Sequence, residues 1–262
     1  MTPEATAIQP PAAASDALAL RDVELRVGGR TVLGPLSLSV APGEVATVMG
    51  PSGCGKSSLL AFICGTLEPA FESRGRVLLG GRDLGPLPPE RRRVGILFQD
   101  DLLFPHLSVA ENLAFGLPPG GGRRRRRRRI EQALAEADLA GFGERDPGTL
   151  SGGQRARVAL LRTLLSEPRA LLLDEPFAKL DIALRARFRS FVFEHARAQR
   201  LPTLLVTHDP ADAHAAGGPL MEIGAGSELP GNSRAMPVEP MPGEDVTTKG
   251  GAARFGARPG SG

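Results

Sequence analysis

A glycine-rich segment, GPSGCGKS, runs from Gly50 to Ser57 and matches the phosphate-binding pattern G-x-x-x-x-G-K-[ST]. An apolar run precedes it and the helical stretch SSLLAFICG follows it, which disfavours a chance glycine-rich turn. Backbone N–H groups of such a loop surround phosphates, Lys56 neutralises the outer ones, and the Ser57 hydroxyl suits Mg²⁺. The expected phosphate contacts are Gly50, Pro51, Ser52, Gly53, Cys54, Gly55, Lys56 and Ser57.

Polar side chains also follow three other apolar runs of the chain. Asp174 and Glu175 follow ALLL, Gln99 follows GILF, and His208 follows TLLVT. Asp174 can hold the Mg²⁺ shell through water, and Glu175 can accept a proton from an attacking water. Gln99 offers a neutral ligand near the metal, and His208 offers a donor to a terminal phosphate. Each residue alone fits an ordinary strand end or turn, but together with the phosphate loop they predict phosphoryl chemistry.

A second glycine-containing segment, LSGGQRARVALLRTLL at 150–165, has no lysine. Ser151 can cap a helix that starts here, and Gly152 and Gly153 allow a ligand to approach the backbone closely. Bare N–H groups at a capped helix start attract an anion without help from a lysine. The alternative is an ordinary surface helix that begins with glycine.

The elements that must position these residues show two patterns. Leu18–Val27 and Thr31–Val40 alternate apolar and polar residues around two glycines, which predicts an antiparallel hairpin. The runs that end in the polar residues are instead continuously apolar, as buried strands of a parallel sheet are. Because the carboxyl ends of such strands lie at one edge of the sheet, we expect the four polar segments to meet there.

The predicted fold class is α/β, a P-loop NTPase with a mostly parallel core sheet. An N-terminal antiparallel β subdomain precedes the core, and a helical subdomain at about residues 100–165 is inserted, centred on the helical segment 108–145. Residues 1–17 and 224–262 are rich in proline, alanine or glycine and are expected to be disordered tails. The folded domain is therefore expected to span 18–223.

Composition narrows the class of protein. The 262 residues suffice for one large domain, no apolar run approaches the roughly 20 residues of a membrane-spanning helix, and two cysteines cannot form a disulfide framework. The N-terminus has an acid and adjacent prolines where a signal peptide has a basic start and an apolar core. These features predict a cytoplasmic protein.

The basic character of the chain is local. The formal net charge is +3, and because Arg123–Arg129 contribute +7, the rest of the chain carries −4. Such a distribution does not indicate nucleic-acid binding. A run of like charges is expected to form a solvated, self-repelling loop. The alternative is contact with anionic lipid headgroups.

In order and spacing, GPSGCGKSS, LFQDDLLFPHLSV, LSGGQ, ALLLDEP, AKLD and VTHD resemble the ATP-binding-cassette (ABC) ATPases over about residues 45–209. In that family LSGGQ belongs to the ATP site of the other protomer. The resemblance implies a head-to-tail homodimer that buries two ATP molecules, with Ser151 and Gly153 of one chain at the γ-phosphate held by Lys56 of its partner. It adds further nucleotide contacts at Ser58, Gly152, Gln154, Asp174 and Asp181, the last of which helps to align the paired chains.

The same resemblance assigns roles at the strand ends. Glu175 is the general base, His208 steadies the γ-phosphate, and Gln99 senses the metal and couples to a membrane partner. The implied ligands of Mg²⁺ are Ser57, Gln99 and Asp174. One position departs from the family pattern: Val27 stands where an aromatic residue usually stacks on adenine, and the chain has no Tyr or Trp. Weakened adenine affinity and poor discrimination between ATP and GTP are therefore expected.

The segment GILFQDDLLFPHLSVAENLAFGL resembles small importer ATPases for thiamine, polyamines, ferric iron or molybdate. In them this region receives a helix of the permease, and Phe104, His106 and Leu107 are the candidate contacts here. For Phe104 and Leu107 the alternative is a place in the core of the helical subdomain.

The resemblance as a whole implies an importer ATPase subunit on the cytoplasmic side of the inner membrane, with permease subunits and a solute-binding protein as partners and no nucleic acid. Selectivity resides in those partners, so thiamine is a candidate substrate by resemblance only. Two alternatives are an exporter subunit and a soluble cassette protein that acts on nucleic acid or ribosomes. The latter class typically has tandem cassettes or long coiled-coil inserts, and neither is visible here.

Overall fold

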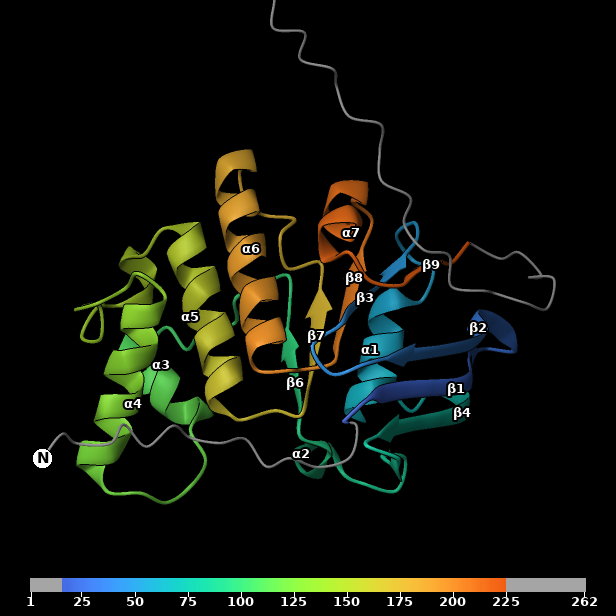
Figure 1. Cartoon of the computed structure of the whole chain (residues 1–262). Coiled ribbons are helices and arrows are strands. Elements are labelled where there is room, and N and C mark those ends of the chain that lie inside the picture. Colours follow the sequence, from blue (N-terminus) through green and yellow to red (C-terminus); the bar gives the residue numbers. More distant parts are fainter. Residues whose placement is uncertain (1–15, 225–262) are drawn as a thin grey trace, which may run out of the picture.

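The computed structural model describes residues 16–224, which form two sheets and the helices around them (Figure 1). The expectations for most of the two tails concern residues outside this range. Within it, the strand order is β2-β1-β4-β5 in one sheet and β6-β7-β8-β3-β9 in the other. The α/β class is confirmed, with an antiparallel sheet at the N-terminus and a parallel sheet at the centre.

The antiparallel sheet is built on the predicted hairpin of β1 (Leu18–Val27) and β2 (Arg30–Val40). Gly28 and Gly29 connect the strands with φ values of 55° and 77°, a left-handed turn that glycine favours. The strands β4 (Phe71–Leu79) and β5 (Arg82–Asp83) complete the sheet and were not predicted. The first six residues of β4 are mostly exposed, so its sequence lacks the alternation that would have revealed it.

The parallel sheet contains the four predicted buried strands. They are β3 (Val45–Met49), β6 (Val94–Leu97), β7 (Ala170–Asp174) and β8 (Thr203–Thr207). A short fifth strand, β9 (Leu220–Glu222), pairs with β3 at the edge and was missed because three residues carry too little pattern. Alternate residues of β7 and β8 enter different cores: Leu172 and Leu204 face the antiparallel sheet, whereas Leu173 and Leu205 face the opposite side.

Helices cover both sides of the parallel sheet. Leu59, Leu60 and Ile63 of α1 (Lys56–Cys64) share a core with the antiparallel sheet. On the other side, α6 (Ile182–Ala198) packs with one face of α5 (Gly152–Leu165). The shorter helices are α2 (Pro89–Arg92), the 3₁₀ helix η1 (Pro147–Thr149) and α7 (Pro210–Ala216).

The expected helical segment consists of α3 (Val109–Gly116) and α4 (Arg123–Glu136), which lie beside α5 (Figure 1). The helix α5 joins two cores, because Val158 and Leu161 face α3 and α4 while Leu160 faces the sheet. The start of α5 is thereby held between the helical segment and the rest of the domain.

The arginine run is not a loop, so that expectation was wrong. Arg123–Arg129 form the first two turns of α4. Arginine is a good helix former, and Ile130 and Leu134 on the same helix are buried against α3 and α5. Arg126 also donates to the backbone carbonyl oxygens of Pro118 at 2.6 Å and Ala114 at 2.8 Å. Packing and these hydrogen bonds outweigh the repulsion between neighbouring charges.

None of the helices within 16–224 combines the length and the apolar character needed to traverse a bilayer.

Candidate functional site

The phosphate loop lies between the end of β3 and the start of α1. Gly53 and Gly55 have φ values of 82° and 88°, in the left-handed region that favours glycine. A Cβ atom at Gly55 would also lie 2.9 Å from Val32 Cγ1 of β2, and one at Gly50 would lie 2.4 Å from the Ile223 carbonyl oxygen. No side chain caps α1, so its first N–H groups are available to an anion.

Lys56 lies beneath this loop and is 5% exposed. Its Nζ donates to the carbonyl oxygens of Gly50 and Pro51, both at 2.8 Å, and lies 3.9 Å from Glu175 Oε1. The ammonium is therefore held in the loop, on the side that faces the end of β7. Cys54 is buried and packs in the core as a small residue.

The strand-end residues meet as predicted for three of the four segments. Ser57 Oγ donates to Asp174 Oδ1 at 3.2 Å, and His208 Nδ1 lies 3.1 Å from Glu175 Oε2. Glu175 has a φ of 46°, and its N–H donates to the Val206 carbonyl oxygen of β8 at 3.0 Å. The adjacent carboxylates have different partners, Ser57 for Asp174 and His208 for Glu175. We name Lys56, Ser57, Asp174, Glu175 and His208 the phosphate cluster.

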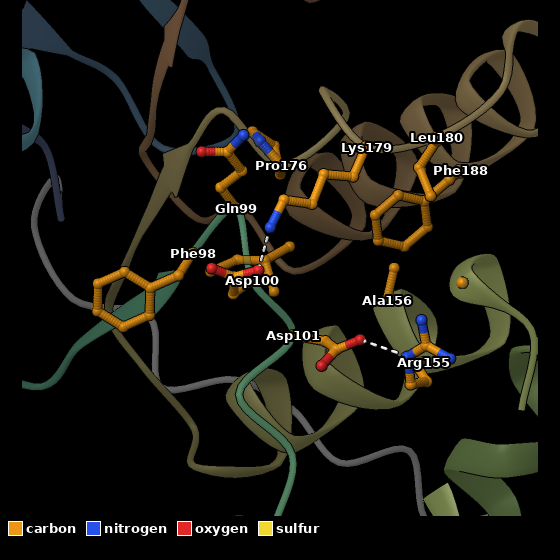
Figure 2. A pocket seen from close by; sticks show the side chains of 12 residues that line it. Phe98, Gln99, Asp100, Asp101, Arg155, Ala156, Pro176, Lys179, Leu180 and Phe188 are labelled. Carbon is orange, nitrogen blue, oxygen red and sulfur yellow. Dashed lines mark hydrogen bonds and ion pairs between the residues drawn. The ribbon is translucent and has the colours of Figure 1, made fainter. Parts of the chain in front are cut away.

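Gln99 lies outside this cluster. It is exposed and lies two residues beyond the end of β6. With Pro176, Lys179 and Gly152 it lines a cavity of 290 Å³, and Figure 2 labels Gln99, Pro176 and Lys179. In the described part of the chain it makes no hydrogen bond to the phosphate cluster. Gln99 therefore does not contact the other proposed metal ligands, and its role as a metal ligand stays a prediction.

The segment at the start of α5 is a capped helix end. Ser151 Oγ accepts from the Gln154 N–H at 3.3 Å, and Gln154 Oε1 accepts from the Ser151 N–H at 2.9 Å, which forms a reciprocal capping box. Ser151 and Gly152 are exposed, whereas Gly153 is buried and a Cβ there would lie 2.4 Å from Leu184 Cδ2. The exposed N-terminal end of α5 can therefore meet a ligand, but no described hydrogen bond joins it to the phosphate cluster.

Asp181 connects this helix start to α6. Its Oδ1 accepts from the Leu184 N–H at 3.0 Å and caps α6, while the Leu184 side chain packs on Gly153. Asp181 and Gly153 are thus fixed relative to each other through one leucine.

Residues 33–178 match the ABC transporter family. The chain belongs to this family. It is 48% identical over 202 residues to the thiamine import ATP-binding protein ThiQ of Cereibacter sphaeroides, a match that covers 76% of this chain and 86% of that protein. It is 46% identical over 198 residues to the uncharacterized ABC transporter ATP-binding protein YnjD of Escherichia coli K12, covering 76% and 91%.

A more distant match is the Fe(3+) ions import ATP-binding protein FbpC 1 of Rhizobium meliloti, 40% identical over 201 residues and covering 76% of this chain but 56% of that protein. The chain is thus an ABC ATPase that binds ATP, as predicted from its motifs.

Arg185 is a residue of this ABC subunit that sequence reasoning missed. From the first turn of α6 it pairs with Asp209, and it donates to the Ala178 carbonyl oxygen at 3.4 Å. Asp209 follows His208 and caps α7, and Ala178 lies three residues beyond Glu175. Arg185 therefore ties together the two loops that contain Glu175 and His208. The chain has so many arginines that residue type alone did not single out Arg185. The available signal was its position in the first helical turn after Asp181.

Val27 lies half-buried at the end of β1, where it pairs with Arg30 and with Phe71. The hairpin flanks the phosphate loop, because Val32 of β2 lies within contact distance of Gly55. The β1–β2 hairpin thus lies beside the phosphate loop, and the weak adenine contact of Val27 stays a prediction.

Asp174→Asn is expected to raise the melting temperature of the nucleotide-free ABC subunit at neutral pH. Burial raises the pKa of the Asp174 carboxyl above its ordinary value of 3.8, and the hydrogen bond from Ser57 only partly lowers it again. A carboxyl with a higher pKa in the folded state costs stability where it is ionised, so its contribution falls as pH rises through that pKa. The gain should therefore disappear in acid, below the unfolded-state pKa, where the native aspartic acid is also neutral.

The melting temperatures of the native protein and of Asp174→Asn, measured from neutral pH down to acid below the unfolded-state pKa, test this prediction. Glu68→Gln, which removes a charge from an exposed side chain, is the matched control and should leave the melting temperature unchanged. A melting temperature of Asp174→Asn below that of the native protein at neutral pH would contradict the prediction. Magnesium-dependent ATP hydrolysis should be lost in the same variant.

Proposed function

We propose that this ABC ATPase is the energy-coupling subunit of an importer, in which two copies bind ATP head to tail and drive separate permease subunits. The observation that carries the proposal is the pair of unlike half-sites on one chain. The phosphate cluster supplies a lysine, an acid pair and a histidine, whereas the exposed cap at Ser151 supplies only helix N–H groups. A second copy in head-to-tail orientation completes both.

Within each composite site the residues have separate tasks. The Lys56 ammonium, held by two carbonyl oxygens, neutralises the phosphates, and α1 directs its uncapped N-terminus at them. Glu175 accepts the proton of the attacking water, and His208, 3.1 Å away, holds that carboxylate and meets the γ-phosphate. Release of the hydrolysed phosphate removes the charge that joins the two chains, so the pair reopens.

The donors present fit Mg²⁺. Ser57 Oγ and Asp174 Oδ1 lie 3.2 Å apart, and both are oxygen atoms, which Mg²⁺ prefers. No group of three or more His, Cys, Asp or Glu within the described residues could hold a metal. This fits an ion that takes its remaining ligands from phosphates and water. Bound there by Ser57 and Asp174, Mg²⁺ would neutralise the charge on the transferred phosphate.

The proposed dimer surface carries an exposed apolar side chain. Ile182, next to Asp181 at the start of α6, is 91% exposed. A second copy that covered this side chain would remove its apolar surface from water, which favours association. Its place beside Asp181, which the resemblance assigns to alignment of the paired chains, supports contact with the second copy.

A second apolar surface lies on the helical segment. Phe115 is 70% exposed and Leu102 is 55% exposed, and the Phe115 ring meets the ring of Phe104 edge to face at 4.8 Å. The Arg162 guanidinium lies 5.5 Å from the Phe104 ring and donates to the Leu102 carbonyl oxygen at 2.8 Å. We name Leu102, Phe104 and Phe115 the apolar docking face. Its first residue, Leu102, lies three positions after Gln99 in the chain. This short connection supports coupling of the nucleotide site to a permease.

Asn112, which the sequence reasoning missed, shapes this face. The side chain is fully buried, and its Oδ1 accepts from the Phe104 N–H at 2.8 Å. Its Nδ2 donates to the carbonyl oxygens of Phe104, Leu107 and Ser108, between 3.0 and 3.1 Å. Phe104, His106 and Leu107 therefore belong to one rigid loop, and Phe104 and Leu107 are half-buried rather than core residues.

The proposed partners follow from this arrangement. The subunit lies at the cytoplasmic side of the inner membrane, where it is attached to its permease. A solute-binding protein delivers the substrate, and thiamine is the first solute to test because ThiQ is named as a thiamine import protein.

Phe115→Ser is expected to abolish co-purification of the subunit with its multispanning permease, while the basal ATPase rate of the isolated subunit stays unchanged. Phe115 is exposed and lies outside the phosphate cluster, so its loss removes apolar contact area without disturbing hydrolysis. Phe98→Ser, at a side chain that is 43% exposed but outside the apolar docking face, is the matched control. Undiminished capture of the permease by Phe115→Ser would rule out this face as the contact.

A further inference from the structure

The arginine run has no task in ATP hydrolysis or in the proposed permease contact. Part of it is structural, because Arg126 binds backbone carbonyl oxygens and Arg127 and Arg129 each pair with a glutamate at 2.8 Å. The side chains of the remaining arginines form no ion pair or hydrogen bond with the residues at 16–224. These unused charges need a separate explanation.

Three of them share one side of α4. At about 3.6 residues per turn, Arg124, Arg125 and Arg128 lie opposite the stripe in which Ile130 and Leu134 are buried. All three side chains are exposed. We name these three residues the arginine face.

The charge of this face is not compensated within the helix. The first turn of α4 has no acidic residue, and its N-cap, Gly122, provides no side-chain hydrogen bond. A helix N-terminus is already positive, and like charges three or four residues apart repel each other. A negative surface placed against this face would therefore relieve an existing electrostatic cost.

The start of α4 is joined to the helix that carries Phe115. Arg126, on the packed side of α4, donates to the carbonyl oxygens of Ala114 and Pro118, the residues on either side of the C-terminal end of α3, where Phe115 is exposed. A permease that binds the apolar docking face would therefore bring its membrane near the start of α4. The chain outside Arg123–Arg129 carries a net charge of −4, which disfavours a nucleic acid laid across the molecule.

We propose that Arg124, Arg125 and Arg128 bind the anionic phospholipid headgroups of the membrane that contains the permease. Guanidinium groups form paired hydrogen bonds with phosphate, and a row of arginines on one helix face matches a plane of headgroups. The inference rests on the proposed function, because the permease brings this face to the bilayer. It adds a second attachment, through lipid, to the one through protein.

The test measures co-sedimentation of the purified, nucleotide-free subunit with vesicles, in the absence of permease. Native protein is expected to bind vesicles that mix phosphatidylcholine with phosphatidylglycerol, and to bind them less as salt is added. The triple change Arg124→Gln, Arg125→Gln and Arg128→Gln should lower the affinity roughly a hundredfold. The corresponding triple change to Lys, which keeps the charge, should retain most of it.

The matched control removes three exposed arginines from the antiparallel sheet: Arg74→Gln, Arg76→Gln and Arg82→Gln. It has the same loss of charge and should bind vesicles like native protein. Equal loss in this control, equal binding of native protein to phosphatidylcholine alone, or tighter binding to a DNA duplex than to anionic vesicles at the same salt would overturn the proposal. Circular dichroism checks that α4 persists in every variant.

The two proposals fail separately. ATPase activity and permease capture are measured on the same glutamine triple variant, and neither depends on vesicle binding by the isolated subunit. Loss of permease capture in Phe115→Ser with vesicle binding intact supports both assignments, because it separates the protein contact from the lipid contact.

Discussion

Replacing Glu175 with Gln is expected to reduce ATP hydrolysis by a factor on the order of 10² to 10⁴, the usual contribution of a general base. The amide keeps the shape of the side chain but cannot take a proton from water. Nucleotide affinity should not fall, because the variant removes a negative charge 3.9 Å from Lys56 Nζ, where phosphate charge must be accommodated. Phosphate release and equilibrium ATP binding, measured on the same preparation, separate the two effects.

A matched variant tests whether loss of any negative charge, rather than loss of the Glu175 carboxylate, lowers the rate of hydrolysis. Glu194→Gln makes the same chemical change on the exposed side of α6, and hydrolysis should continue at the native rate. An unchanged rate in Glu175→Gln would show that another group accepts the proton, and the assigned role of Glu175 would then be wrong.

Two inactive variants are expected to restore activity when they are mixed. Lys56→Ala damages the phosphate cluster and Ser151→Arg blocks the exposed cap of α5, so each variant alone has no intact composite site. In an equimolar mixture half of the dimers contain one chain of each kind, and one of their two sites is intact, which predicts roughly a quarter of the native rate. The ATPase rate of the mixture, against that of each variant alone, measures this recovery.

The control for this experiment combines two changes within the phosphate cluster. Mixed dimers of Lys56→Ala and Glu175→Gln have one defect in each site, so no recovery is expected. Ser151→Arg also removes a helix cap, which costs about 1 kcal/mol, and its thermal unfolding must be checked. If Lys56→Ala and Ser151→Arg show no recovery when mixed, the sites are not shared between chains.

Much of the fold and of the site could be predicted from local patterns. The hairpin around Gly28-Gly29 and the four buried strands were correct because alternation and continuous apolar runs are properties of neighbouring residues. The meeting of Ser57 with Asp174, which lie 117 positions apart, followed from the general rule that parallel strands end at one edge. Gln99 shows the limit of that rule, because it lies at the correct edge without touching the phosphate cluster.

Errors arose where long-range packing outweighs local pattern. The arginine run reads as a repelling loop by its charge, yet it is helical because Ile130 and Leu134 further along α4 are buried and Arg126 finds carbonyl partners. The exposed first half of β4 has no alternation of apolar and polar residues. It forms a strand through its antiparallel pairing with β1.

By itself the sequence determined the family of this protein, because the phosphate loop with Lys56, the acid pair with Glu175 and the helix start at Ser151 are local patterns of neighbouring residues. Only the tertiary structure decided which groups touch. The contacts of Arg185 with the loops that contain Glu175 and His208, and the packing of Leu184 on Gly153, depend on how α6 crosses its neighbours. A helix crossing is set by the packing of whole surfaces, and no short stretch of residues contains that information.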